Sequence, residues 1–403
     1  MTPSPLLAAP PSALVARLAP LHAAMTHWRH ALHAHPELAH QEHATAALVA
    51  RVLGEAGLAV TQGVGGTGVV ATVHGREAGG ASLGLRADMD ALAVREAASR
   101  PHASCQPGVM HACGHDGHVA MLLGAACHLA RTRAFAGTVQ CVFQPAEEGA
   151  GGADAMIADG LFERFPMERV FSLHTWPDLP AGAFAVHDGP VMAACDAFTV
   201  TIQGRGAHAA QPQRAVDPVL VAGHLITATQ SLISRGTDPF ESAVVSITRV
   251  EAGQAFNVIP DTARLEGSMR CLSEGARERL RRDLARLVEQ GAAAFGATAS
   301  VSFRSVARVT ANTPAEAALA ARVAGEVVGP AQVARTLAPS MTAEDFGSFL
   351  AHRPGAYVWL GQGAGEDPPA LHQPTFDFND AVLGLGAAWW VGLVEAALPE
   401  GKG

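Results

Sequence analysis

The sequence is almost without lysine. The only lysine among its 403 residues is Lys402, next to the C-terminus. This excludes Schiff-base chemistry, a pyridoxal phosphate site and a phosphate loop that ends in Gly-Lys-Ser/Thr. Charged residues make up only 16% of the chain, and Asp+Glu 37 exceed Lys+Arg 28 to give a formal net charge of -9. This mildly acidic balance, with no basic run, argues against nucleic acid or an anionic membrane surface as a partner.

Paired cysteine motifs and long apolar runs are missing as well. The six cysteines show no CxxC pair, so we expect free thiols in a reducing compartment rather than a disulfide scaffold. The N-terminal segment has no basic start and is broken by prolines, which makes it a poor signal peptide. The longest apolar stretch, Ala381 to Val394, is shorter than the ~18 residues that a membrane span needs. We therefore expect a cytoplasmic protein.

What the chain does contain is ample material for two domains. Hydrophobic residues make up 49% of it, and residues 14–57 have the pattern of helices. From Gly68 to Gly206, short β-rich runs alternate with helical ones. The expected strands are 68–74, 81–87, 138–144 and 169–175. Such alternation is typical of an α/β domain with a mixed, mostly parallel and buried sheet.

The middle third has a different pattern. Strands are expected at 197–206, 243–250, 262–271 and 297–306, with helices at 216–234 and 274–294. The resulting order, βαββαβ, is the ferredoxin-like split unit. We therefore predict a discontinuous α/β domain of residues 1–193 and 309–403, interrupted by an inserted α+β domain of residues 194–308.

Metal-competent side chains follow several of the expected strands. Asp88 and Asp90 come after the second strand, Glu147 and Glu148 after the third, and His174 lies near the end of the fourth. Ligands of open α/β sheets bind beyond the carboxyl ends of the strands, so these side chains are expected to converge. The segment HACGHDGH, residues 111–118, precedes the long helix and adds further donors.

Each of these signals has a structural alternative. Cys113 and His115 suit one or two transition metal ions, but the same loop could be a helix start capped by Asp116 with a buried cysteine. Neighbouring glutamates are commonly solvated surface charge, yet here one can bind metal while the other acts as general base on an activated water. A lone histidine such as His174 is more often a core residue. Convergence of four segments favours the metal site.

Two other patterns are rejected. GVGGTG, residues 63–68, fits GxGxxG but leads into a strand, so it indicates a hairpin turn rather than a phosphate-binding loop. A nucleophile–base pair of Cys113 and His115 is disfavoured because such partners normally come from distant segments. Spacing alone does not select His372 over Asp377, Asp380 or Glu344 as a further ligand.

The order of motifs resembles one known family over nearly the whole chain, from about Ala24 to Trp390. The motifs are RHALHAHPELAHQE, LRADMDAL, GVMHACGHDGHVAMLLGAA, VFQPAEEGAGGA, LHTWP, GRGAHAAQP, FNVIPD, MTAEDF and LHQPTFDFND. The chain resembles the hippurate hydrolases and N-acyl-amino-acid amidohydrolases, a group that includes the indole-3-acetyl-amino acid hydrolases. These belong to the larger aminoacylase and carboxypeptidase G-like metallopeptidases.

This resemblance implies a dinuclear metal site in a zinc-aminopeptidase-like catalytic domain, with the inserted domain as a lid that forms a homodimer or a dimer of dimers. The implied metal ligands are Cys113, His115, Glu148, His174 and His372. Glu147 would be the general base and later the general acid, and Asp90 would orient a ligand. In the lid, His208 would reach a neighbouring active site to help hold the oxyanion, although a bulge histidine beside glycines is its structural alternative. Asn257 and Arg270 would contact the substrate.

The expected reaction is hydrolysis of N-acyl or N-aroyl amino acids, such as hippurate, to a carboxylic acid and a free amino acid. Two divalent ions per subunit are implied, Mn²⁺ or Zn²⁺, with Co²⁺ or Ni²⁺ also compatible with a thiolate and imidazoles. Two alternatives stay open: a dipeptidase or aminoacylase with another acyl preference, and an inactive amino-acyl ligand-binding relative. A thiol hydrolase that uses Cys113 is disfavoured; it would survive chelators and be inactivated by alkylating agents.

Overall fold

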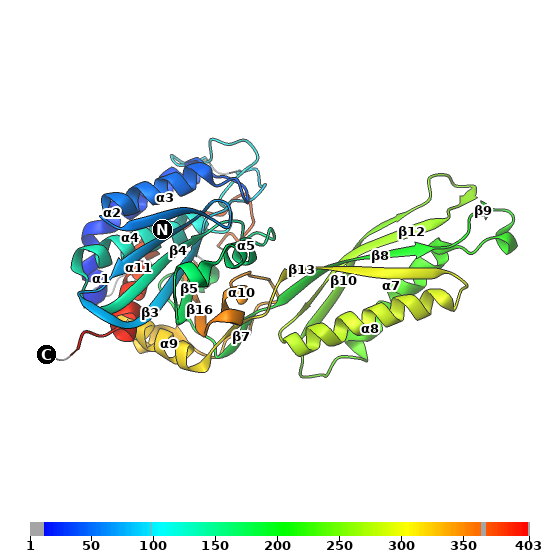
Figure 1. Cartoon of the computed structure of the whole chain (residues 1–403). Helices are drawn as coiled ribbons and strands as arrows, with labels where there is room; N and C mark the ends of the chain where they lie inside the picture. Colours follow the sequence, from blue (N-terminus) through cyan, green and yellow to red (C-terminus); the bar gives the residue numbers. More distant parts are fainter. Residues whose placement is uncertain (1–11, 98, 364–367, 402–403) are drawn as a thin grey trace. The chain divides into compact units, whose positions relative to one another are not determined.

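The computed structural model describes residues 12–97, 99–363 and 368–401 (Figure 1). The chain divides into two compact units. The first unit comprises the described residues of Met1–Val191, Ala311–Ala338 and Asp345–Gly403, and the second comprises Met192–Thr310 and Pro339–Glu344. The short segment Pro339–Glu344 therefore belongs with the inserted unit, whereas the sequence analysis places it in the α/β domain.

The first unit is built on an eight-stranded sheet. Its strands are β1 (Ala59–Val64), β2 (Gly68–His74), β3 (Glu77–Asp88), β4 (Ala136–Gln144), β5 (Arg169–Pro180), β6 (Phe184–Ala185), β15 (Val333–Ala334) and β16 (Gly355–Gly363), in the order β1-β2-β4-β3-β5-β16-β6-β15. The central strands β4, β3, β5 and β16 run parallel to one another. Antiparallel pairs flank them, including the hairpin β1–β2 at residues 64–68. This confirms the predicted mixed, mostly parallel sheet.

Helices bury the sheet of the first unit. They are α1 (Ala13–Leu18), α2 (His22–Ala34), α3 (His43–Glu55), α4 (His115–Thr132), α5 (Gly152–Ala158), α6 (Leu161–Arg164), α9 (Pro314–Val328), α10 (Gly347–His352) and α11 (Leu383–Ala397). The long helix α4 lies against β3 and packs between α2 and α11 (Figure 1). Leu83, Leu85 and the α4 residues Met121 and Leu122 are fully buried in one hydrophobic core. Burial of the central strands explains their near-continuous apolar sequence.

Among the described residues, one helical stretch is long and apolar enough to cross a membrane by length and composition. It runs from Asp380 to Ala397 and includes Asp380 and Glu395, so it is longer than the uninterrupted apolar stretch Ala381 to Val394. In the fold, 61% of this stretch is buried. Trp389 and Trp390 have no exposed surface and lie in the core cluster with α4 and α9. Packing in the core accounts for its apolar character.

The second unit has the predicted βαββαβ order. Its elements are β8 (Ala194–Gln203), α7 (Pro218–Ser234), β10 (Ala243–Ala252), β12 (Thr262–Cys271), α8 (Glu274–Ala293) and β13 (Thr298–Ala307). The strands form an antiparallel sheet in the order β10-β12-β8-β13, and α7 and α8 pack against it (Figure 1). Phe198, Val200 and Ile202 of β8 are buried while the residues between them are more exposed, as expected of a sheet with one covered face.

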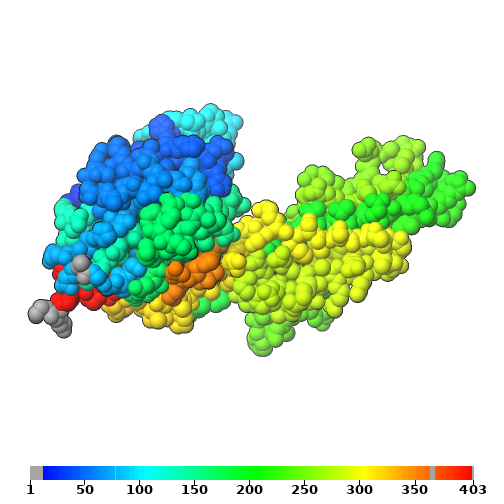
Figure 2. All heavy atoms as spheres, in the orientation of Figure 1, coloured from blue at the N-terminus to red at the C-terminus, as the bar shows by residue number. Residues whose placement is uncertain are grey.

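Short elements complete the chain. They are η1 (Ala19–Leu21), η2 (Pro212–Arg214), η3 (Pro330–Gln332), η4 (Asp380–Val382), β7 (Gly189–Met192), β14 (Thr310–Asn312), β9 (Ala207–His208) and β11 (Val258–Ile259). In the second unit, β9 pairs with β11 to form a separate two-stranded ribbon. The ribbon follows β8 and precedes β12. In the space-filling view, the green segment with β9 and the yellow-green segment with β11 lie together at one end of this unit (Figure 2).

Candidate active site

Three neighbouring parallel strands deliver the predicted metal-binding segments to one edge of the first unit. In the order β4-β3-β5, Asp88 ends β3, Glu147 follows β4 by three residues, and His174 lies on β5. Because parallel strands end at the same edge of a sheet, these side chains meet although the sequence separates them. The start of α4 lies at the same edge and contributes Cys113 and His115.

The turn before α4 depends on Gly114. Its φ of 85° is in the left-handed region, and a Cβ there would lie 2.7 Å from the hydroxyl of Thr175. Glycine therefore allows the chain to present Cys113 and His115 on either side of one tight turn. His115 Nδ1 donates to the carbonyl oxygen of Asp90 at 2.9 Å, since a carbonyl only accepts. This leaves Nε2 of His115 unprotonated in the neutral ring and available as a metal ligand.

Asp90 lies where it orients two donors at once. One carboxylate oxygen is 3.3 Å from His115 Nδ1, and the other accepts the backbone N–H of Glu148 at 3.0 Å. His115 Nε2 and Glu148 Oε1 are 3.9 Å apart. Both atoms are buried, and neither makes a hydrogen bond within the described part of the chain. Two such atoms facing one another are the arrangement that a bound cation would satisfy.

Cys113 and His174 form a second contact. Cys113 Sγ lies 3.4 Å from His174 Nε2, and His174 Nδ1 donates to the carbonyl oxygen of Thr175 at 2.7 Å. The bond to Thr175 fixes the tautomer of His174, so its Nε2 faces the sulfur with a lone pair. The side chains of both residues are buried.

His372, which spacing could not select, lies beside Glu148. Its Nε2 is 3.3 Å from Glu148 Oε1, and its side chain is 52% exposed. Its backbone N–H donates to the carbonyl oxygen of Ala112 at 2.8 Å. A small cluster of Met110, Ala112 and Phe376 packs the two segments together. The structure thus places His372 next to the turn that carries Cys113.

The donors form overlapping groups of ligand atoms that lie within 4.8 Å of one another. One group is Cys113, Glu148 and His372, and another is His115, Glu147 and Glu148. Cys113 belongs to the first group and also contacts His174. The five predicted ligands therefore make up one continuous set. The donor types, one thiolate with imidazoles and a carboxylate, are those of transition metal sites.

Protonation in the metal-free protein reflects a strongly negative site. Burial lowers the pKa of His174 well below its usual value, so this ring is neutral. Burial would also lower the pKa of His115, but Asp88, Asp90 and Glu148 outweigh it and raise the pKa to about 10. Burial and the charges of Glu148 and Glu147 raise the pKa of the Cys113 thiol well above its usual value. The carboxylates thus favour positive charge here, which a cation would supply.

Glu147 points into the same space but has a different setting from Glu148. It is 9% exposed, and its Oε1 accepts the backbone N–H of Asp345 at 3.4 Å. The two neighbouring glutamates therefore have separate contacts, one toward Asp345 and one toward His372. This separation is what a base and a ligand in adjacent positions require.

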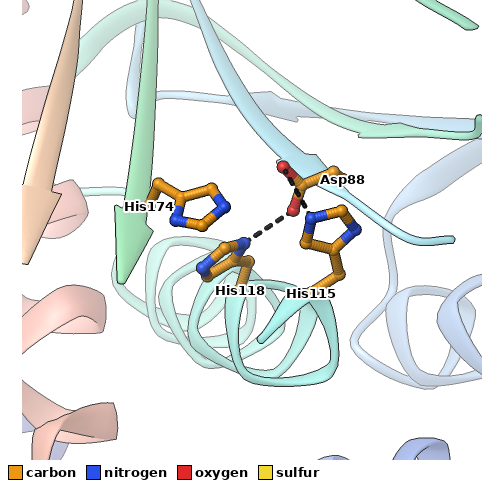
Figure 3. Close-up of side chains that lie close together, drawn as sticks. All are labelled: Asp88, His115, His118 and His174. Carbon is orange, nitrogen blue, oxygen red and sulfur yellow. Dashed lines mark hydrogen bonds and ion pairs between the residues drawn. The ribbon is translucent and has the colours of Figure 1, made fainter. Parts of the chain in front are cut away.

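His118 and Asp88 lie at the same edge, although the sequence analysis gave neither residue a specific role (Figure 3). Asp88, His115, His118 and His174 place ligand atoms within 4.8 Å of one another. The backbone N–H of Thr175 donates to His118 Nε2 at 3.0 Å, so Nδ1 carries the proton and donates to Asp88 at 2.6 Å. Both ring nitrogens are used, so His118 joins Thr175 of β5 to Asp88 rather than binding metal. Its position three residues after His115, on the same helix face, was the available signal.

The remaining predicted residues lie in the second unit. His208 is exposed on β9, where its Nδ1 accepts the N–H of Ala210 at 3.0 Å. Asn257 is exposed and adjacent to β9, since its carbonyl oxygen accepts the N–H of Ala209. Arg270 lies near the end of β12 and donates to the carbonyl oxygen of Met341 at 3.0 Å. The structure brings His208 and Asn257 together and separates both from Arg270.

Comparison with known proteins gives one consistent result. The profile of peptidase family M20/M25/M40 matches residues 84–396. A hippurate hydrolase of Campylobacter jejuni is 40% identical over 365 residues, which cover 91% of this chain and 94% of that protein. An N-acetylcysteine deacetylase of Bacillus subtilis is 37% identical, covering 94% of this chain and 97% of that protein.

A solved structure is similar over the same length. It is the YXEP protein of Bacillus subtilis, described as a dinuclear metal-binding peptidase of the M20 family. It superposes with a TM-score of 0.82 at 34% sequence identity, covering 94% of this chain and 99% of that one. The likeness therefore extends over both units of the chain.

Proposed function

The chain belongs to peptidase family M20/M25/M40, and from this premise we propose that it is a metal-dependent amidohydrolase that cleaves N-acyl amino acids. The products are a carboxylic acid and a free amino acid. One observation carries the proposal: Glu147 lies within 4.8 Å of the ligand atoms of His115 and Glu148, and Glu148 in turn lies in one group with Cys113 and His372. A general base next to a set of metal donors is the arrangement that hydrolysis by an activated water needs.

Two divalent ions fit the donor set. His115 Nε2 and Glu148 Oε1 are buried without hydrogen-bond partners among the described residues, and Cys113 links the His174 side of the site to the Glu148 side. When bound, the ions supply Lewis-acid polarisation and lower the pKa of water. The soft thiolate and the imidazoles favour Zn²⁺ or Mn²⁺, with Co²⁺ and Ni²⁺ also compatible. Asp90 holds His115 and the backbone of Glu148 in the orientation that binding requires.

In the reaction, Glu147 accepts a proton from the attacking water and later returns it to the leaving amine. Its carboxylate accepts the N–H of Asp345 and lies beside His115 and Glu148. General-base catalysis of this kind contributes on the order of 10²–10⁴ in rate. In the proposed assignment, His208 stabilises the oxyanion, Arg270 binds the carboxylate of the amino acid, and Asn257 contacts polar groups of the substrate.

The positions of these lid residues support a homodimer. Thr262 pairs with Gln203 at the end of the sheet that leads to β9 and β11, and Arg270 lies eight positions further along β12. At roughly 3.4 Å per residue, this separates Arg270 from the ribbon with His208 by about 27 Å or more. A small N-acyl amino acid does not span that distance. In the proposal, therefore, one substrate meets Arg270 and His208 of different copies of the chain.

The second unit also offers a surface that a second copy would cover. Strand β10 is at the edge of the four-stranded sheet, and its residues Val244 and Val250 are exposed. Helix α7 lies next to it and exposes Val219 and Leu220. Exposed apolar groups beside an unpaired strand edge are typical of a protein interface.

The cytoplasmic location expected from the sequence stays a prediction.

The experiment that tests the function is a substrate panel with metal removal and add-back. Hippurate and N-acetyl-methionine are incubated with the enzyme as prepared, after chelator treatment, and after addition of Mn²⁺ or Zn²⁺. We expect chelator-sensitive release of the free amino acid that metal restores. A thiol hydrolase would survive the chelator and be inactivated by alkylation. No release with any metal, with two ions bound per chain, would favour an inactive ligand-binding relative.

A further inference from the structure

The loop that carries both glutamates begins with an unusual backbone conformation. Ala146, which directly precedes Glu147, has a φ of 55°. A residue with a Cβ seldom adopts this left-handed region, because the side chain comes too close to the following carbonyl oxygen. Ala146 is also fully buried. Something in the surrounding structure must hold it there.

The side chain of Glu42 makes the contact that does so. Its Oε1 accepts the backbone N–H of Ala146 at 2.8 Å and that of His40 at 3.0 Å, and the hydroxyl of Thr67 donates to Oε2. The carboxylate is completely buried. A buried carboxylate of this kind is stabilised only by such hydrogen bonds, so its direction is fixed.

Glu42 has no other evident task. It is the N-cap residue of α3, but its side chain makes no capping hydrogen bond. The free N–H groups at the start of α3 are capped instead by Glu37, whose carboxylate accepts those of Ala44 and Thr45 at 3.0 and 2.9 Å. The carboxylate of Glu42 points away from its own helix and toward the loop after β4.

Two other carboxylates hold the same loop further along. Asp90 accepts the N–H of Glu148, and Asp345 accepts the N–H of Ala153 at 2.9 Å. Gly152 closes the loop, because its N–H donates to the carbonyl oxygen of Ala146 and a Cβ there would lie 1.6 Å from the carbonyl oxygen of Pro145. Three acids from distant segments thus define the backbone between residues 146 and 153. Glu147 lies between the first two.

We propose that Glu42 is a positioning residue for this site: it holds Ala146 in the left-handed conformation and thereby directs Glu147 and Glu148 to their separate positions. If Ala146 relaxed to an ordinary conformation, its N–H would turn away and the two following side chains would change direction. The inference rests on the proposed function for the task of Glu147, whereas its effect on Glu148 concerns metal binding alone.

The test compares Glu42→Leu, which keeps the size of the side chain but removes the acceptors, with the double variant Glu42→Leu/Ala146→Gly. Chelator-stripped protein is titrated with Mn²⁺ in a calorimeter, and kcat, KM and Tm are measured on the reloaded enzyme. Glu42→Leu is expected to weaken Mn²⁺ binding and to lower kcat by about 10–100-fold each, the usual effect of losing a group that orients a ligand. KM should change little.

Adding Ala146→Gly should recover most of both losses, because glycine adopts positive φ without a steric cost. Glu42→Gln should keep most of the affinity, since its amide oxygen still accepts both N–H groups and its NH₂ donates to Thr67. The matched control Glu37→Leu should leave Mn²⁺ affinity and kcat unchanged. Should Glu42→Leu not fold, Thr67→Val replaces it, with a smaller loss that Ala146→Gly also recovers.

Wild-type Mn²⁺ affinity and kcat in Glu42→Leu would overturn the proposal. So would a loss that Ala146→Gly does not recover, because it would reflect a general effect of the buried acid on the fold. The two proposals fail separately. A wild-type enzyme that hydrolyses no N-acyl amino acid would overturn the proposed function, while the Mn²⁺ titrations would still decide the task of Glu42.

Discussion

The two units of the molecule hold their functional side chains in opposite ways. In the first unit most of the side chains are buried, His372 excepted, and several are fixed by another residue: His115 by Asp90, His174 by Thr175, Glu147 by Asp345. In the second unit His208 and Asn257 are exposed on a short ribbon and its neighbouring turn. The first unit is therefore organised before a substrate arrives, whereas the second offers groups whose use depends on what docks beside them.

The largest effect on turnover is expected in the buried site of the first unit, from a change of Glu147. Glu147→Gln keeps the shape of the side chain but removes the base, so kcat should fall on the order of 10²–10⁴ with metal still bound. Steady-state kinetics and metal analysis of the purified variant check both parts. The neighbouring change Glu148→Gln is the matched control, because it should lose metal as well as activity. Retained turnover in Glu147→Gln would overturn its assignment as the base.

A smaller loss of turnover is expected in the second unit. His208→Ala removes one oxyanion donor, which should lower kcat on the order of 10²–10³ with metal content unchanged. The informative step is to mix this variant with Glu147→Gln, after dissociation and reassociation of the subunits. If His208 acts on the site of a second copy, each mixed dimer has one intact site.

At equal mixing, half of the dimers are mixed, so about a quarter of wild-type turnover should return. No recovery, in a mixture that is shown to exchange subunits, would mean that His208 serves its own chain or none. That outcome would remove the contrast between the metal donors, which come from one chain, and His208, which is proposed to act on the site of a second copy.

The second unit also contains a buried ion pair, which is expected to affect stability rather than catalysis. Arg277 on α8 donates two hydrogen bonds to Asp196 on β8, at 2.8 and 2.7 Å, and both side chains are buried. Removing one partner of a buried pair costs about 3–5 kcal/mol, so Arg277→Ala should lower the stability of this unit by that amount. Thermal unfolding monitored by limited proteolysis would detect the lower stability of the second unit.

The control for this change is Arg286→Ala, which breaks an ion pair with Asp283 in which the Arg286 side chain is 65% exposed, and should cost about 0–1 kcal/mol. Mn²⁺ affinity should be unchanged in both variants, because the metal donors belong to the first unit. Loss of metal on unfolding of the second unit would show that metal binding by the first unit depends on the folding of the second.

The sequence predicted those parts of the site that depend on local pattern. Asp88 ends a buried strand, Glu147 follows one and His174 lies on one, and the rule for parallel strand ends places them together before any coordinates are known. His372 could not be found this way, because its place depends on a turn with φ of 65° and a bond to Ala112 from a distant segment. The motif resemblance supplied it instead.

Other residues gave no usable signal. The sequence analysis assigns no role to Glu42, and only the fold shows that its carboxylate is buried against Ala146. The segment Pro339–Glu344 was predicted in the α/β domain, whereas the structure places it in the second unit. A segment of six residues is too short to have a sequence pattern that shows which unit it joins. Contacts between distant segments are what local patterns leave undetermined.

The smallest effect is expected from thiol modification, and it separates the metal mechanism from a thiol one. Of the six cysteines, Cys105 is exposed and makes no contact with the site donors, whereas Cys113 and Cys141 are buried. Burial raises the pKa of Cys141 to about 12 and that of Cys127 to about 11. A raised pKa leaves little thiolate at neutral pH, and the thiolate is the reactive form.

Iodoacetamide at pH 7 should therefore modify Cys105 first and leave turnover within about twofold of the untreated enzyme, because the other thiols are protonated or shielded. Peptide mass spectrometry identifies the modified residue, and Cys105→Ser should abolish the fast modification without changing kcat. Raising the pH toward 11 increases the thiolate fraction of Cys127 and should speed its modification. Rapid inactivation at pH 7 that metal does not prevent, with the label on Cys113, would support the thiol hydrolase instead.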